Sequence, residues 1–176
     1  MNKQERYEAR ALMTDAFQES ATAQKSHQIF GLPFSMDESE LIIIPIPWDV
    51  TVSFRPGTAQ GPQAIRDASY QVDLYDPLTP DAWKYGFAME EIDQTVRAKG
   101  AYLRHIALNC IQDQENGVSL HDSDLMRMQE EVNQGGKWLN EWLYKKAITY
   151  LHQKKIVAVV GGDHSVPLGL MQALAD

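Results

Sequence analysis

The sequence predicts an α/β fold built on a parallel sheet. Two short runs, Leu41–Ile46 and Ile156–Val160, are apolar on consecutive residues, as is typical of strands buried on both faces of such a sheet. A loop and a helix follow the first run, and a glycine turn and a helix follow the second. Strand, loop and helix in succession form the first half of a βαβ unit.

Length and composition favour one globular domain. The chain has 176 residues, 44% of them apolar, and 16 Lys+Arg against 24 Asp+Glu give a net charge of −8. The negative charge, without a basic run, argues against nucleic acid or an anionic membrane as a partner. No apolar run approaches the ~20 residues of a transmembrane helix. A polar N-terminus and a single cysteine predict a cytoplasmic protein.

The first 40 residues are expected to form a helix and an arm. Apolar residues recur at helical spacing over residues 4–18, so a helix is predicted there. Residues 19–40 are polar and contain Gly31 and Pro33, which favours an extension outside the main domain. The predicted domains are therefore 1–40, a helix and arm, and 41–176.

A helix is expected to open at Gly61-Pro62, because proline is well tolerated in a first turn. Pro77 and Pro80 are expected to end it. Its apolar face would be formed by Ile65, Ala68, Val72 and Tyr75. A second short strand is predicted over residues 85–89.

Helical stripes are predicted over residues 102–110 and 125–132, separated by a polar loop at 113–122. Gly135-Gly136 is expected to break the chain before a strong helix at 137–153. After the strand at 156–160, Ser165 is expected to cap a last helix with Pro167 in its first turn.

The turn Gly161-Gly162-Asp163-His164-Ser165 carries the clearest functional signal. In open α/β sheets, ligands bind outside the carboxyl ends of the strands, so Asp163 and His164 would face a metal or a substrate. The alternative is structural: His164 caps the turn and Asp163 bonds the helix N-terminus. Neither the dinucleotide fingerprint nor a Walker A loop is present.

Two segments together resemble the ureohydrolases, the arginase/agmatinase family. Residues 159–165, Val-Val-Gly-Gly-Asp-His-Ser, with Pro-Leu-Gly at 167–169, resemble the first metal-ligand motif of that family. Ile44–Asp49 and Arg55–Arg66 are similar to its N-terminal strand, loop and helix. Residues 68–76 look more like the agmatinase branch. The resemblance covers residues 41–93 and 137–176.

The resemblance implies a three-layer α/β/α sandwich around a parallel sheet, incomplete at the C-terminus, and hydrolysis of a guanidino C–N bond. It implies a dinuclear Mn²⁺ centre, with Ni²⁺ or another divalent ion as the alternative, whose bridging hydroxide attacks the guanidinium carbon. His164 would supply one metal ligand, and Asp163 would hydrogen-bond beside the centre or act as a local cap. No residue is assigned a catalytic role. A homo-oligomer acting on a small guanidino substrate is expected.

The other metal-ligand motifs of the family are missing. The chain contains no Asp-x-His-x-Asp, and Asp122-Ser123-Asp124 precedes the histidine motif, so it is interpreted as a helix cap. The remaining histidines are expected to be structural or exposed. They are His27, His105, His121 and His152.

The chain is therefore interpreted as the N-terminal half of an agmatinase-like enzyme, inactive alone. The alternatives are another substrate (guanidine, arginine, a guanidino acid or formiminoglutamate) or a non-catalytic truncated module. Structural or interface roles are expected for Arg55 and Arg66, core or pocket-mouth positions for Trp48 and Phe54, and a buried thiol for Cys110.

Overall fold

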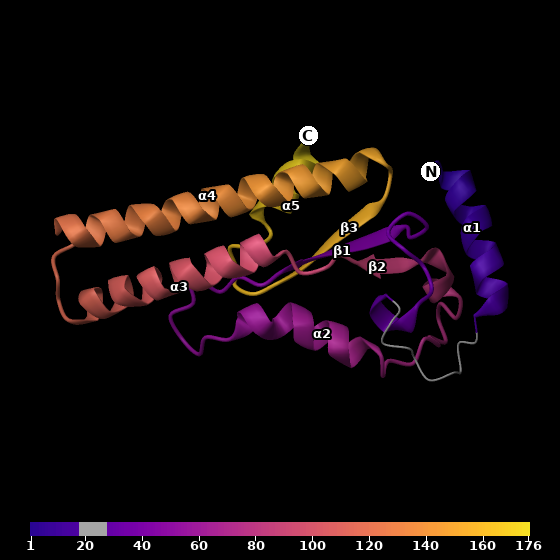
Figure 1. The fold of residues 1–176 in the computed structure, drawn as a ribbon, viewed down its shortest axis with the longest axis horizontal. Coiled ribbons are helices and arrows are strands. Elements are labelled where there is room, and N and C mark those ends of the chain that lie inside the picture. Colours follow the sequence, from indigo (N-terminus) through magenta and orange to yellow (C-terminus); the bar gives the residue numbers. More distant parts are fainter. Residues whose placement is uncertain (18–27) are drawn as a thin grey trace. The chain divides into compact units, whose positions relative to one another are not determined.

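The structure of the chain is a computed structural model that describes residues 1–17 and 28–176 (Figure 1). The end of the predicted first helix, part of the predicted arm and His27 lie outside the described residues. The helices and strands are α1 (Lys3–Ala16), β1 (Leu41–Ile46), α2 (Gly61–Ser69), β2 (Phe87–Met89), α3 (Gln94–Glu115), α4 (Ser123–His152), β3 (Ile156–Gly161) and α5 (Leu168–Ala175).

The fold divides into two compact units. The first comprises residues 1–45, 63–91 and 148–160, and the second comprises residues 46–62, 92–147 and 161–176. The first unit holds the body of the sheet. The second holds the loops that follow β1 and β3.

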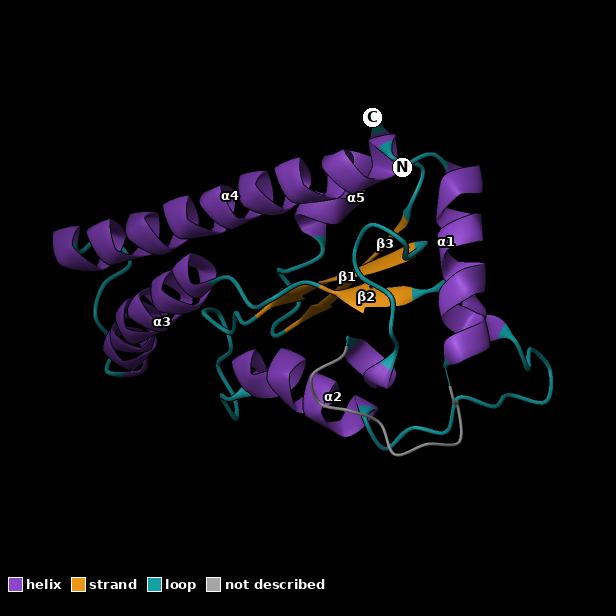
Figure 2. Cartoon of the chain, turned by 45° about the vertical axis from the view of Figure 1, so that its right-hand side comes forward, coloured by secondary structure: helices purple, strands orange, loops and turns teal. Residues whose placement is uncertain are grey.

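Three strands in the order β2-β1-β3 form the sheet (Figure 2). β1 and β2 are parallel, with Leu41 opposite Phe87 and Ile43 opposite Met89. At the start of β3, the Ile156 N–H donates to the Glu40 carbonyl that precedes β1, at 2.8 Å. The predicted α/β class with a parallel sheet is confirmed, and the central strand is the most deeply buried.

Part of the predicted arm belongs to the core of the first unit. Ile29 packs with Ile43 and Met89 of the sheet, while Leu32 and Phe34 surround Trp83. These apolar residues are too few and too irregularly spaced to give a helix or strand period, so composition alone suggested an extension. Ile29, Leu32 and Phe34 are instead buried. The domain boundary at residue 40 stays a prediction.

Helix α2 ends earlier than predicted, at Ser69 rather than near Pro77. The Ser69 hydroxyl donates to the Arg66 carbonyl and accepts from the Phe30 N–H. The proposed apolar face is also wrong, because Ile65, Val72 and Tyr75 are exposed. Arg66 instead anchors the helix by donating to the carbonyls of Met89 and Glu90, which fits the structural role expected for it.

The predicted break at Gly135-Gly136 is wrong, because α4 runs through both glycines as a 30-residue helix. A Cβ built on Gly135 would lie 2.1 Å from a methyl carbon of Leu103 in α3. The glycine therefore serves close helix packing. Figure 1 shows α3 and α4 running side by side in the second unit. Asp122 accepts from the N–H groups of Asp124 and Leu125, which confirms the predicted cap.

None of the helices in the described ranges is both long and apolar enough to cross a bilayer.

A buried charge cluster closes the first unit just before β1. Arg6 and Arg10, one turn apart on α1, both pair with the Glu40 carboxylate, at 3.1 and 3.0 Å. Burial by itself raises the pKa of the Glu40 carboxyl, but the hydrogen bonds from Arg6 and Arg10 outweigh burial and lower it below 4.5. Two guanidinium groups share this one carboxylate. Removing the carboxylate therefore leaves two buried cations without a counter-charge.

We expect Glu40→Gln to lower the free energy of unfolding at pH 7 by about 3–5 kcal/mol, since it removes the shared anion of a buried cluster. The matched control is Glu91→Gln. The Glu91 side chain is 87% exposed, and Arg66 keeps its bonds to the Met89 and Glu90 carbonyls, so less than about 1 kcal/mol should be lost. Urea denaturation followed by circular dichroism measures both.

The lowered pKa of Glu40 also sets the sign of a pH dependence. A carboxyl with a depressed folded-state pKa stabilises the fold above its unfolded pKa, and the stabilisation is lost as pH falls through the folded value. The stability gap between wild type and Glu40→Gln should therefore narrow as the pH is lowered from 7 to well below 4.5. An unchanged gap over that range would contradict the assigned ion pairs.

Candidate metal-ligand turn

The turn after β3 lies against the loop after β1, and both segments belong to the second unit. A Cβ on Gly162 would lie 1.9 Å from the Trp48 carbonyl oxygen, so a side chain cannot be accommodated there. The Asp163 N–H donates to that same carbonyl, at 2.8 Å. The second glycine of the motif is thus required for close backbone approach.

The Asp163 carboxylate joins these two segments. Its Oδ2 accepts from the N–H and the hydroxyl of Thr51, at 3.0 and 2.9 Å. Its Oδ1 accepts from the N–H and the hydroxyl of Ser165. With four donors bonded to its two oxygens, Asp163 holds the turn in place, which is the structural role left open by the sequence.

Ser165 is not the helix cap that the sequence predicted. Helix α5 begins at Leu168, its N-cap position is Pro167, and no side chain caps it. The Ser165 hydroxyl is engaged by Asp163 instead. Ser165 lies three residues before Leu168, so its side chain is not at the N-cap position of α5.

Arg104 of α3 also holds the loop that carries Thr51. The side chain is buried, and its Nη1 donates to the carbonyls of Val50 and Val52, which flank Thr51. Nothing in the sequence pattern singled out this residue as functional. Arg104 lies directly beside the apolar stripe of α3, and the only signal was a basic side chain next to buried positions.

His164 is exposed, and within the described residues its side chain makes no hydrogen bond or ion pair. Its imidazole therefore does not cap the turn, contrary to the structural alternative. An imidazole held on a fixed turn suits one position in the coordination sphere of Mn²⁺, Ni²⁺ or another divalent ion.

A complete metal site is not present in the part of the chain that the structure describes, where no three His, Cys, Asp or Glu side chains gather. His105, His121 and His152 are all exposed. The residues present thus fit one ligand position of a metal centre and do not fit a whole centre. The assignment of the metal ligand to His164 stays a prediction.

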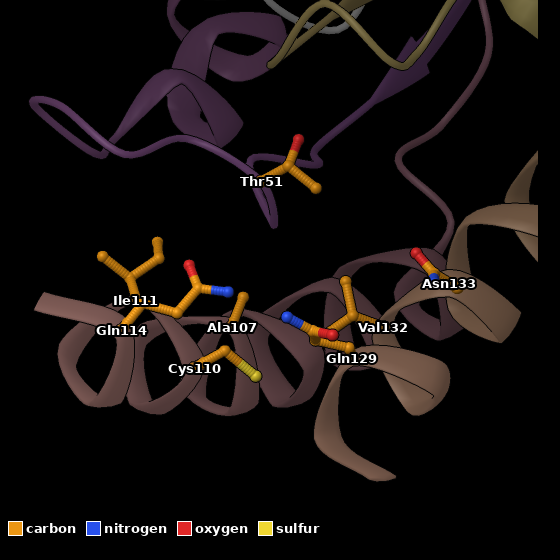
Figure 3. Close-up of a pocket in the computed structure, with 8 residues that line it drawn as sticks. All are labelled: Thr51, Ala107, Cys110, Ile111, Gln114, Gln129, Val132 and Asn133. Carbon is orange, nitrogen blue, oxygen red and sulfur yellow. The ribbon is translucent and has the colours of Figure 1, made fainter. Parts of the chain in front are cut away.

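A cavity of about 300 Å³ lies within the second unit, between α3, α4 and the loop at Thr51 (Figure 3). Cys110 lines it together with Gln129 and Val132 of α4. Burial, together with the charge of Asp113, raises the pKa of the Cys110 thiol. A protonated thiol is a poor nucleophile, which agrees with the buried, non-catalytic role expected for this residue.

Trp48 and Phe54, both in the loop at 48–60, differ in burial. Trp48 is fully buried, as expected for a core residue. Phe54 is 75% exposed, so its expected core position is wrong. The guanidinium of Arg55 lies 5.1 Å from the centre of the Phe54 ring, and a cation can be favourable there even in water. Asp49 orders the same loop by accepting from the Gly57 N–H at 2.8 Å.

Comparison with known proteins establishes the family. The chain belongs to the arginase family, whose family model matches residues 39–176.

Named relatives come from the same family. The chain is 27% identical over 141 residues to an N(1)-aminopropylagmatine ureohydrolase of Thermus thermophilus, covering 78% of this chain and 35% of the relative. It is 46% identical over 43 residues to an agmatinase of Bacillus anthracis, covering 24% of this chain and 15% of the relative. The chain thus spans about a third of the length of its most extensively aligned relatives. No solved structure gives a significant match.

We expect Asp163→Ala to lower the free energy of unfolding by about 1–3 kcal/mol, because it removes the acceptor for four donors. Asp124→Ala is the matched control. The Asp124 side chain forms an exposed pair with Arg127, so its removal should cost about 0.5 kcal/mol or less. Thermal unfolding followed by circular dichroism compares the two. Equal losses of stability in the two variants would show that the hydrogen bonds to the Asp163 carboxylate do not stabilise the turn.

The 176-residue chain should bind Mn²⁺ no more tightly than a single exposed imidazole does, because His164 is without clustered ligands among the described residues. Isothermal titration calorimetry of the purified chain tests this, with His164→Ala as the comparison. Two tight sites on the unaltered chain would overturn the description of the metal site as incomplete.

Proposed function

We propose that this chain is part of an agmatinase-like ureohydrolase, which hydrolyses a guanidino C–N bond and releases urea. The observation that carries the proposal is the exposed His164 on a turn clamped by Asp163 and Thr51 at the end of a parallel strand. Membership of the arginase family supports it, because named relatives are ureohydrolases and agmatinases.

The roles proposed for this chain's residues are local. His164 presents one imidazole to a divalent metal pair, which we propose to be Mn²⁺, with Ni²⁺ as the alternative. Asp163 and Thr51 fix the direction of the turn, and Arg104 fixes the loop that carries Thr51. A metal pair of this kind supplies a hydroxide at neutral pH, which an already delocalised guanidinium requires.

The missing ligands must come from outside the described residues. Relatives about three times as long as the aligned stretch leave room for them. The 176-residue chain by itself is therefore proposed to be inactive. We propose a cationic guanidino substrate of the agmatine type, on the basis of the agmatine-derived substrates in the names of several relatives.

A second candidate is a non-catalytic module that acts by association. It is favoured by one observation, the lack of a metal-ligand cluster in the described ranges. Reading the complete open reading frame for an Asp-x-His-x-Asp and an Asp-x-Asp motif after residue 176 separates the two. Their presence in frame supports the enzyme, and a reading frame without them supports the module.

For the protein expressed from the complete open reading frame, we expect His164→Ala to lower kcat for urea release from agmatine by roughly 10²-fold or more. The reason is that one ligand of the ion pair that generates the hydroxide is removed. His152→Ala is the matched control, an exposed histidine at the end of α4, and it should change kcat less than about twofold. Full urea release by His164→Ala at saturating Mn²⁺ would refute the role of His164.

A further inference from the structure

A second cavity, of about 610 Å³, lies in the first unit. Its walls come from α1, from the residues that precede β1 and β2, and from the start of β3. Its volume falls within the range of small-molecule sites in proteins. The residues that line it are Lys3, Gln4, Tyr7, Arg10, Glu40, Tyr85, Lys154 and Ile156.

The cavity is basic in a chain whose net charge is −8. Its carboxylate, Glu40, is already shared by two arginines. Lys3 and Lys154 are both exposed, and neither ammonium group has an ion pair or a hydrogen-bond acceptor within residues 1–17 and 28–176. The wall therefore carries two uncompensated positive charges, which attract an anion.

Arg10 adds a buried donor without a partner. The residue is 5% exposed, and its Nε has no acceptor in the described part of the chain, although its Nη1 bonds Glu40. Its course is fixed by Gly86, where a Cβ would lie 2.9 Å from the Arg10 Cδ. Buried donors are almost always satisfied in folded proteins, and no acceptor for this N–H lies within residues 1–17 and 28–176.

Apolar side chains stand beside the cations. Tyr7, Tyr85 and Ile156 line the cavity and are 63%, 68% and 62% exposed. Exposed rings and a branched aliphatic side chain offer surface on which a flat apolar group can stack. The cavity thus combines a positive wall with an apolar wall.

We propose that this cavity binds a small organic anion with an aromatic or otherwise flat apolar body. The acidic group accepts from the Lys3 and Lys154 ammonium groups, beside the buried Arg10 guanidinium, and the apolar body lies against Tyr7, Tyr85 and Ile156. The site uses no residue of the His164 turn, so it holds independently of the ureohydrolase activity.

The test uses two fluorescent probes that differ by one anionic group. The anion 8-anilinonaphthalene-1-sulfonate should bind the 176-residue chain at one site, and its neutral counterpart N-phenyl-1-naphthylamine should bind more weakly. The Lys3→Gln/Lys154→Gln double variant should weaken sulfonate binding roughly tenfold, because each exposed charge contributes severalfold. Binding of the neutral probe should change less than about twofold.

The matched control is Arg97→Gln/Lys137→Gln, which removes two exposed charges that do not line the cavity. It should leave sulfonate binding within about twofold of the unaltered chain. A third variant, Tyr7→Ala/Tyr85→Ala, should weaken both probes. The proposal is overturned if the sulfonate and the neutral probe bind equally, if sulfonate binding is absent, or if the control weakens it as much as the Lys3/Lys154 variant does.

Discussion

The bond between the Asp163 carboxylate and Thr51 is the contact on which the candidate site depends. Both donors of Thr51, its N–H and its hydroxyl, reach the same oxygen of Asp163, while Gly162 lets the turn approach the Trp48 carbonyl. Two loops that follow different strands are thereby held in one arrangement. His164 and His121 are both exposed. The hydrogen bonds of Asp163 are what hold the turn that carries His164 in one position.

Support for this contact extends into α3. Arg104 donates to the carbonyls of Val50 and Val52, on each side of Thr51. The loop that contacts Asp163 is therefore itself fixed by a buried cation. Residues just before β1 are fixed in a comparable way, since Glu40 is held by two arginines of α1. Buried polar contacts thus hold the segment before β1 and the segment after it, each within its own unit. A few kcal/mol of such interactions decide whether a segment of this kind stays ordered.

Local pattern was sufficient where one short segment determines its own structure. The strand at Leu41–Ile46 has the predicted bounds, β3 extends the predicted run by one glycine, and Asp122 caps α4 as expected. Consecutive apolar residues and a capping side chain act over a few residues, so the sequence displays them directly. The glycine turn was equally visible, although its Ser165 bonds Asp163 rather than the helix.

Tertiary contacts decided the rest. Gly135 is typical of a helix break when considered alone, yet α4 passes through it. The space left by its missing side chain is occupied by Leu103 of α3. Ile29, Leu32 and Phe34 lie in a polar stretch and are buried only because the sheet and Trp83 accept them. Arg104 has only a weak local signature, a basic side chain beside the apolar stripe of α3, because its partners are carbonyls about fifty residues away. Further ligands for the metal centre proposed at His164 could not be found in this sequence, because the family's other ligand motifs do not occur in it.

The most direct measurement of the central claim is anomalous diffraction at the manganese edge, on crystals of the protein expressed from its complete open reading frame and grown with Mn²⁺. The account predicts two manganese peaks ~3.5–4 Å apart, one of them within coordination distance of an imidazole nitrogen of His164, with the Asp163 oxygens still bonded to Thr51. Manganese peaks remote from His164, or an Asp163 carboxylate that has left Thr51 to bind the metal, would contradict it.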